Sequence, residues 1–205
     1  VKKFDIGVDL SLFNQVNITF DYFHDVRNRI LMARASWPVM LGYWGSKPWS
    51  NIGEVVNQGF ELSVNWTKQF GKDLMVDFRG NFTYNQNEHK YVDEPNYPYV
   101  WQTDTGKPLN TYKGYIAEGL FSSEEEIANS PDQSQLGANI MPGDIKYRDI
   151  NGDGKITTED QVMISSYDWK PRIQYGFGLN VVYKNFDLGV FFSGSARRKI
   201  MLNSG

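Results

Sequence analysis

Strict alternation of apolar and polar residues runs through six stretches of this chain. In residues 4–12 (FDIGVDLSL) every even position is apolar and every odd position is small or polar. A period of two residues indicates β-strands with one apolar and one polar face. We therefore expect an all-β fold, an antiparallel meander of about six strands with long structured loops. The expected strands cover about residues 4–12, 16–24, 59–67, 74–84, 174–183 and 186–193.

The connections between these stretches alternate in length. Three are short enough for hairpins, at residues 13–15, at about 67–73 and at 184–185, whereas the other two run from about 25 to 58 and from about 85 to 173. In a meander, this order places both long loops at the same end of the sheet. Outer-membrane β-barrels have tight turns at one end and long loops at the other, so the pattern favours a barrel wall.

Aromatic residues gather at the ends of the expected strands, as the interfacial girdles of a membrane barrel do. A soluble sheet that packs its aromatic side chains into a core is the alternative interpretation. The residues concerned are Phe4, Tyr22, Trp66, Tyr84, Tyr175, Tyr183 and Phe186.

Composition excludes several classes of function. The net charge of −3 argues against a nucleic-acid partner, and the absence of Cys excludes thiolate catalysis and disulfides. With two His residues, a histidine-rich metal site is also excluded. There is no apolar run long enough for a membrane-spanning helix. Because both ends of the chain fall within or just after strand patterns, we expect it to be part of a longer protein.

Residues 149–160 (DINGDGKITTED) have the spacing of a calcium-binding loop. Carboxylate or amide oxygens fall at positions 1, 3, 5 and 12, a glycine at position 6 allows a sharp turn, and position 7 offers its backbone carbonyl. Asx turns without an ion are the alternative, but the three carboxylates would then repel one another. We expect calcium to brace the long loop. The predicted ligands are Asp149, Asn151, Asp153, Lys155 and Asp160.

Other candidate sites in the loops are weaker. Four tryptophans, Trp37, Trp44, Trp49 and Trp101, are candidates for contact with a substrate or a lid, because aromatic rings stack on sugar faces; structural packing of the loops explains them equally well. Six loop or strand carboxylates could supply a hydrolase pair, yet no spacing fixes one and solvated surface charge is the default. They are Glu54, Glu61, Glu88, Asp93, Glu94 and Glu118. We do not expect an enzyme.

Three stretches together resemble the C-terminal barrel region of SusC-like TonB-dependent outer-membrane transporters. They are NIGEVVNQGFELSVNW (51–66), MPGDIKYRDINGDGKITTEDQVMI (141–164) and YGFGLNVVYKNFDLGVFFSG (175–194), in the order that the family has. They cover under a third of the chain, but the strands between them also fit.

The resemblance implies a location in the cell outer membrane and a 22-stranded barrel closed by an N-terminal plug. It further implies import of glycans, peptides or other oligomeric nutrients, driven by TonB through an N-terminal region that this sequence lacks. A SusD-like surface lipoprotein and outer-membrane lipid would be its partners. The main alternative is a soluble, calcium-braced all-β carbohydrate-binding module. It would bury the stripe of Phe4, Ile6, Val8 and Leu10 against a second sheet, whereas a barrel would expose this stripe to lipid.

Overall fold

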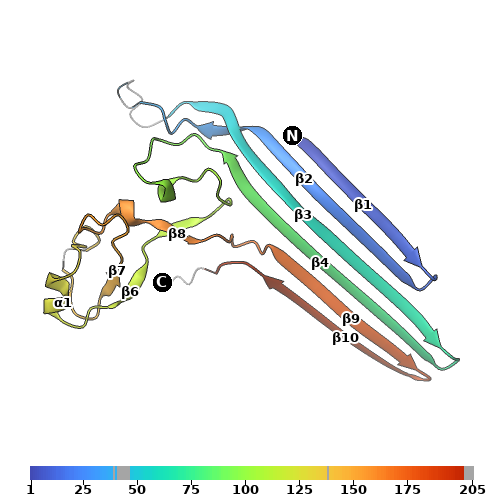
Figure 1. Cartoon of the computed structure of the whole chain (residues 1–205). Helices are drawn as coiled ribbons and strands as arrows, with labels where there is room; N and C mark the ends of the chain where they lie inside the picture. Colours follow the sequence, from blue (N-terminus) through green and yellow to red (C-terminus); the bar gives the residue numbers. More distant parts are fainter. Residues whose placement is uncertain (39, 41–46, 138, 201–205) are drawn as a thin grey trace.

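Six long strands form one antiparallel sheet, in which each strand pairs with its neighbours along the meander. The computed structural model describes residues 1–38, 40, 47–137 and 139–200. In it the sheet is a single layer with the strand order β1-β2-β3-β4-β9-β10 (Figure 1). This confirms the predicted all-β meander of six strands. The strands are β1 (Lys2–Leu12), β2 (Val16–Ala33), β3 (Trp49–Phe70), β4 (Leu74–Tyr91), β9 (Ile173–Tyr183) and β10 (Phe186–Ala196).

All three short turns of the sheet lie at one end, at the lower right of Figure 1, and both long connections lie at the other end. In the turn between β1 and β2, Phe13 and Asn14 adopt positive φ angles of 54° and 51°. Lys184, between β9 and β10, does the same at 53°. Tight hairpin turns need such left-handed residues because their twist then matches that of the strands.

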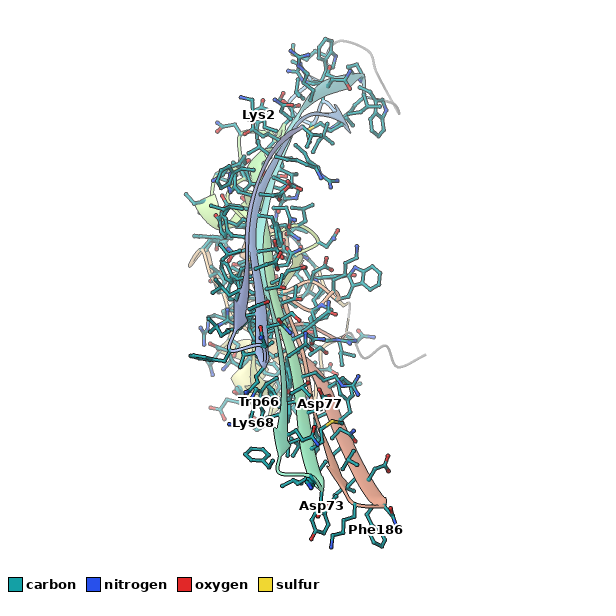
Figure 2. The ribbon with its side chains drawn as sticks, turned by 90° about the vertical axis from the view of Figure 1, so that its right-hand side faces the viewer. Lys2, Trp66, Lys68, Asp73, Asp77 and Phe186 are labelled. Atoms are coloured by element: carbon teal, nitrogen blue, oxygen red, sulfur yellow. The ribbon has the colours of Figure 1, made fainter. Side chains whose placement is uncertain are left out.

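The two faces of the sheet differ in chemistry, as the alternation predicts. Even-numbered residues of β2, β3 and β4 form cross-strand aromatic contacts, with the Phe60 ring 5.7 Å from Phe82 and 6.1 Å from Phe20. Odd-numbered residues form polar pairs on the other face, such as Thr67 with Asp77 at 2.6 Å. In Figure 2, which shows the curved sheet nearly edge-on, Trp66 and Lys68 lie on one side and Asp77 on the other.

Three strands extend seven or more residues beyond the bounds that the alternation predicts. The predicted loops at about 25–58 and 85–173 shrink to 34–48 and 92–172, because β2, β3 and β4 continue past the expected ends. The pairing of β2 with β3 shifts register between Arg27 and Ile30. This β-bulge breaks the period of two, so the strand beyond it carries no alternating signal.

The connection from β4 to β9 contains small elements of its own. Two two-stranded sheets pair β5 (Tyr112–Gly114) with β8 (Val162–Ser165), and β6 (Ala117–Leu120) with β7 (Ile145–Tyr147). A short helix, α1 (Glu124–Ala128), is capped by Ser123, whose side chain accepts a hydrogen bond from the Glu126 amide. Two 3-10 turns, η2 (Val100–Gln102) and η3 (Thr158–Asp160), complete the region.

Little apolar surface is buried in this single-layer arrangement. Among the described residues, the buried hydrophobic side chains are Val56, Phe121 and Ile156. No helix in the described part of the chain is long and apolar enough to cross a membrane.

Candidate functional site

The predicted calcium loop, residues 149–160, lies directly before β8 in the long connection. Gly152 and Gly154 have φ angles of 77° and 82°, a conformation that glycine adopts without steric cost. Both carboxylate oxygens of Asp149 accept backbone hydrogen bonds across this turn, from Gly152 at 2.7 Å and from Gly154 at 2.8 Å. The first predicted ligand therefore also shapes the loop.

The third and fifth positions of the loop, Asn151 and Asp153, each accept a hydrogen bond from the amide two residues further on, at 3.0 and 2.8 Å. The next part of the loop is fastened to Asp132, whose N–H donates to the carbonyl of Gly154 and whose carbonyl accepts from Ile156. These bonds connect Lys155, the seventh position, to a segment more than twenty residues earlier in the chain.

Asp160 is fully buried and holds the loop together. One carboxylate oxygen accepts hydrogen bonds from the backbone N–H groups of Ile150 and Asn151, and the other accepts from Thr157 at 2.8 Å. Ile156 is also fully buried. The residue predicted as the closing ligand thus bonds backbone groups from both halves of the loop.

No salt bridge among the described residues involves Asp149, Asp153 or Asp160. Their negative charges therefore lack a Lys or Arg partner in the part of the chain that the structure describes. Within that part, no group of three or more His, Asp or Glu side chains converges in the manner of a metal cage. The predicted set mixes carboxylates with an amide and a backbone carbonyl, and calcium binding there stays a prediction.

Trp101, one of the four candidate tryptophans, joins the calcium loop to the segment before η2. Its indole Nε1–H donates to the carbonyl of Glu159 at 2.8 Å. Its ring stacks on Tyr99 at a centroid distance of 4.5 Å and an interplanar angle of 8°. Because both the ring face and the donor are used within the loop region, Trp101 has a structural role here.

The other candidate tryptophans come from different elements. Trp37 lines a surface hollow of about 770 Å³ with Pro38, Lys47 and Glu94. Trp49 begins β3 and is exposed, and Trp44 lies outside the described residues. A role of these residues in substrate or lid contact therefore stays a prediction.

Asp93, two residues after the end of β4, is buried, whereas a solvated surface charge is the default expectation for it from the sequence. It accepts hydrogen bonds from Arg34 Nε at 3.2 Å and from the Ser36 amide and hydroxyl at 3.0 and 2.8 Å. Burial, the largest single influence, raises the pKa of Asp93, but the bonds from Ser36 and Arg34 together hold that pKa below its ordinary value. The carboxylate ties the connection after β2 to the end of β4.

Glu94, the next residue, has a similar structural use. Its carboxylate accepts hydrogen bonds from the backbone amides of Asp104 and Thr105 and from the Thr105 hydroxyl. Adjacent carboxylates that are both occupied by structural donors do not form the acid and base pair of a glycoside hydrolase.

A sequence profile of the family described as TonB dependent receptor-like, beta-barrel matches residues 1–198. The chain belongs to this family. Its match extends across every strand of the meander, which decides between the two alternatives in favour of a barrel wall. The resemblance to SusC-like TonB-dependent transporters is confirmed, and the family consists of outer-membrane transport proteins.

Two curated relatives come from Formosa agariphila. TonB-dependent receptor P3 is 28% identical over 98% of this chain, and TonB-dependent receptor P26 is 26% identical over 96% of it. The chain spans 20% of the length of each of these relatives.

Solved structures share the fold. The RagAB peptide importer in its open-open state matches with a TM-score of 0.66 and 17% identity, and the closed-closed state with 0.60 and 18%. Each match covers 96% of this chain, and 20% and 21% of the solved chain respectively.

Proposed function

We propose that this chain forms part of the wall and outer loops of a TonB-dependent transporter in the cell outer membrane. In this proposal the whole protein imports oligomeric nutrients, either glycans or peptides, and catalyses no reaction. The observation that carries the proposal is the segregated meander, with its short turns at one end and its long loops at the other (Figure 1).

The outward stripe of the sheet supports a lipid-facing wall. Phe4, Ile6, Val8 and Leu10 are 55%, 53%, 46% and 47% exposed. Apolar side chains in such a row are stable when they meet hydrocarbon, while the polar face lines a water-filled lumen.

The loop region offers a surface for a partner. Leu120 is 63% exposed, Met141 61% and Ile145 44%. Leu120 and Ile145 are paired across β6 and β7, and neighbouring exposed apolar side chains favour protein contacts. We propose a SusD-like surface lipoprotein as the partner there, and TonB as the energy source acting through other parts of the full-length protein.

We also propose that residues 149–160 bind calcium. Support comes from the spacing of oxygen donors and from three carboxylates that have no cationic side chain as a partner among the described residues. Asp149, Asn151 and Asp153 and the Lys155 carbonyl would hold the ion, together with Asp160. A bound ion would neutralise these charges and stiffen the long connection.

Spin labels at two adjacent residues of β3 test the wall. In the full-length transporter in lipid, one single-cysteine variant is Val64→Cys, on the apolar face, and its matched control is Asn65→Cys, on the polar face. A nitroxide at position 64 should collide with dissolved oxygen, and one at position 65 with a water-soluble nickel chelate.

The same accessibility at both positions would contradict the proposal, as would a full-length protein that stays in aqueous solution without detergent. Nutrient uptake that persists after TonB is removed would contradict the proposed role of TonB as the energy source, without bearing on the proposed wall.

A further inference from the structure

A polar hollow of about 430 Å³ lies on the polar face of the sheet, between the strands and the segment that leads into β9. This volume falls in the range of about 300–1,000 Å³ that is typical of ligand sites. Its floor comes from three neighbouring strands, β3, β4 and β9. Its rim is made by Pro108, Asp168, Lys170, Pro171 and Arg172. The floor residues are Asn57, Glu61, Thr83, Asn85, Asn87 and Gln174.

The strand register brings these floor residues together. Asn57 pairs with Asn87 across β3 and β4, and Thr83 pairs with Glu61 on one side and with Gln174 on the other. All belong to the polar face opposite the aromatic contacts of Phe60. Their relative positions are therefore fixed by the backbone ladder of the sheet.

Most of the polar floor has no partner within the chain. Among the described residues, no hydrogen bond or ion pair uses the side chains of Asn57, Glu61, Thr83, Asn85 or Gln174. Side-chain amides and carboxylates in a recess are normally satisfied by protein, water or ligand. This floor therefore has several donors and acceptors that are free to meet a bound molecule.

The rim, in contrast, is held in place. The Asp168 carboxylate accepts hydrogen bonds from Asn110 at 2.9 Å and from the Trp169 amide at 2.6 Å. Arg172 lies over the Tyr167 ring at 5.1 Å. The rim is therefore held by bonds within the chain, and binding would mainly order the floor side chains.

The chemistry of the lining matches a peptide better than a sugar. Each Asn or Gln offers one acceptor and two donors, which is what the C=O and N–H of a peptide group need. Glu61 supplies an anion on the floor. The rim carries the cations Lys170 and Arg172 beside the Asp168 carboxylate, which already accepts two hydrogen bonds within the chain. None of the described lining residues is aromatic, so the hollow lacks a face on which a sugar ring would stack.

We propose that this hollow binds a short peptide segment with free termini, its amino group near Glu61 and its carboxylate near Lys170 and Arg172. The inference rests on the proposed transporter, because the hollow then lies along the path of the nutrient. The proposal therefore makes peptides, rather than glycans, the substrate class of the transporter.

The test uses the full-length transporter with three probes. They are a pool of random tripeptides with free termini, the same pool acetylated and amidated at its ends, and maltotriose. Glu61→Gln should reduce retention of the free tripeptides about tenfold, as expected for loss of a charge-assisted hydrogen bond, and leave the blocked pool unchanged. Asn57→Ala and Asn85→Ala should weaken both peptide pools. Mass spectrometry after gel filtration measures the retained probe.

Asp77→Asn is the matched control, because Asp77 lies on the same face of β4 outside the hollow, and it should leave retention unchanged. Equal retention in the wild type and the floor variants would overturn the proposal. Retention of maltotriose alone would overturn the substrate class. If no probe binds while the spin labels at 64 and 65 still report lipid and water, the peptide site is wrong and the transporter wall stands.

Discussion

At the scale of single residues, replacing Asp93 should weaken the structure in its immediate surroundings. Asp93→Ala leaves the Ser36 amide and Arg34 without their acceptor in a largely buried place, which we expect to cost about 2 kcal/mol of local stability. Hydrogen exchange at the Ser36 amide should then accelerate about thirtyfold in the full-length protein.

Glu88→Ala is the control for this variant, because Glu88 forms an ion pair with Lys90 at the surface and neither is buried. Exchange at Ser36 should stay the same in the control. If Asp93→Ala behaved like the control, the carboxylate would not be holding the connection.

The same residue predicts a response to acid. The pKa of Asp93 is lower in the folded protein than its ordinary value of 3.8, so its contribution to stability is fully present above that value. The contribution is lost as the pH falls through the folded pKa. Protection of the Ser36 amide, corrected for intrinsic exchange, should therefore collapse below about pH 3.8 while the amides of β3 stay protected. If the Ser36 amide instead lost protection when the pH was raised, the predicted direction of the pH dependence would be wrong.

The role of Asp93 leaves no signal in the sequence, for a physical reason. Its partners Arg34 and Ser36 lie 59 and 57 residues away along the chain. A lone carboxylate in a polar segment has no periodic pattern, and only the folded connection brings the three residues together. The pattern of the predicted calcium loop, in contrast, can be read from the sequence because all of its predicted ligands lie within one short segment.

At the scale of elements, the alternation located the strands but not their ends. It predicted β4 to end near residue 84, whereas the strand continues to Tyr91. A period of two arises where one face meets apolar surroundings and the other meets water. In residues 85–91 (NQNEHKY) both faces are polar, so the strand has no signal beyond the apolar stripe.

At the element scale, substitutions in the predicted calcium loop should distinguish an aspartate that acts mainly as an ion ligand from one that mainly holds the backbone. Asp153→Ala should loosen the loop and leave the strands intact, because it removes one predicted ligand and one turn bond to the Lys155 amide. In the wild type, a chelator should increase protease cleavage within residues 122–165, and in Asp153→Ala the chelator should make little further difference.

Asp160→Ala serves as the comparison. It removes three backbone bonds from a fully buried carboxylate, so cleavage should be high with and without chelator. If protease cleavage of the wild type changed neither with chelator nor with added calcium, an ion in this loop would be ruled out.

At the scale of the whole molecule, the two faces of the wall should respond oppositely to charge. Val64→Arg places a cation on the apolar face and should destabilise the folded full-length transporter by about 2–4 kcal/mol. Asn65→Arg, one residue along on the polar face, should cost much less. Urea titration in lipid vesicles, followed by the shift between folded and unfolded bands on a gel, measures both. Equal destabilisation by the two variants would mean that the strand is not a wall between lipid and water.

The pairing of β4 with β9 has a further consequence for biogenesis. Every other contact in the sheet joins strands separated by a turn of a few residues or by residues 34–48, whereas this one closes a ring through residues 92–172. Closing so long a ring has an entropic cost, and internal bonds such as that between Trp101 and Glu159 shorten the free chain that must be closed. A lesion in the outer loops should therefore appear as slow or failed assembly of the seam between β4 and β9, even where no wall residue has changed.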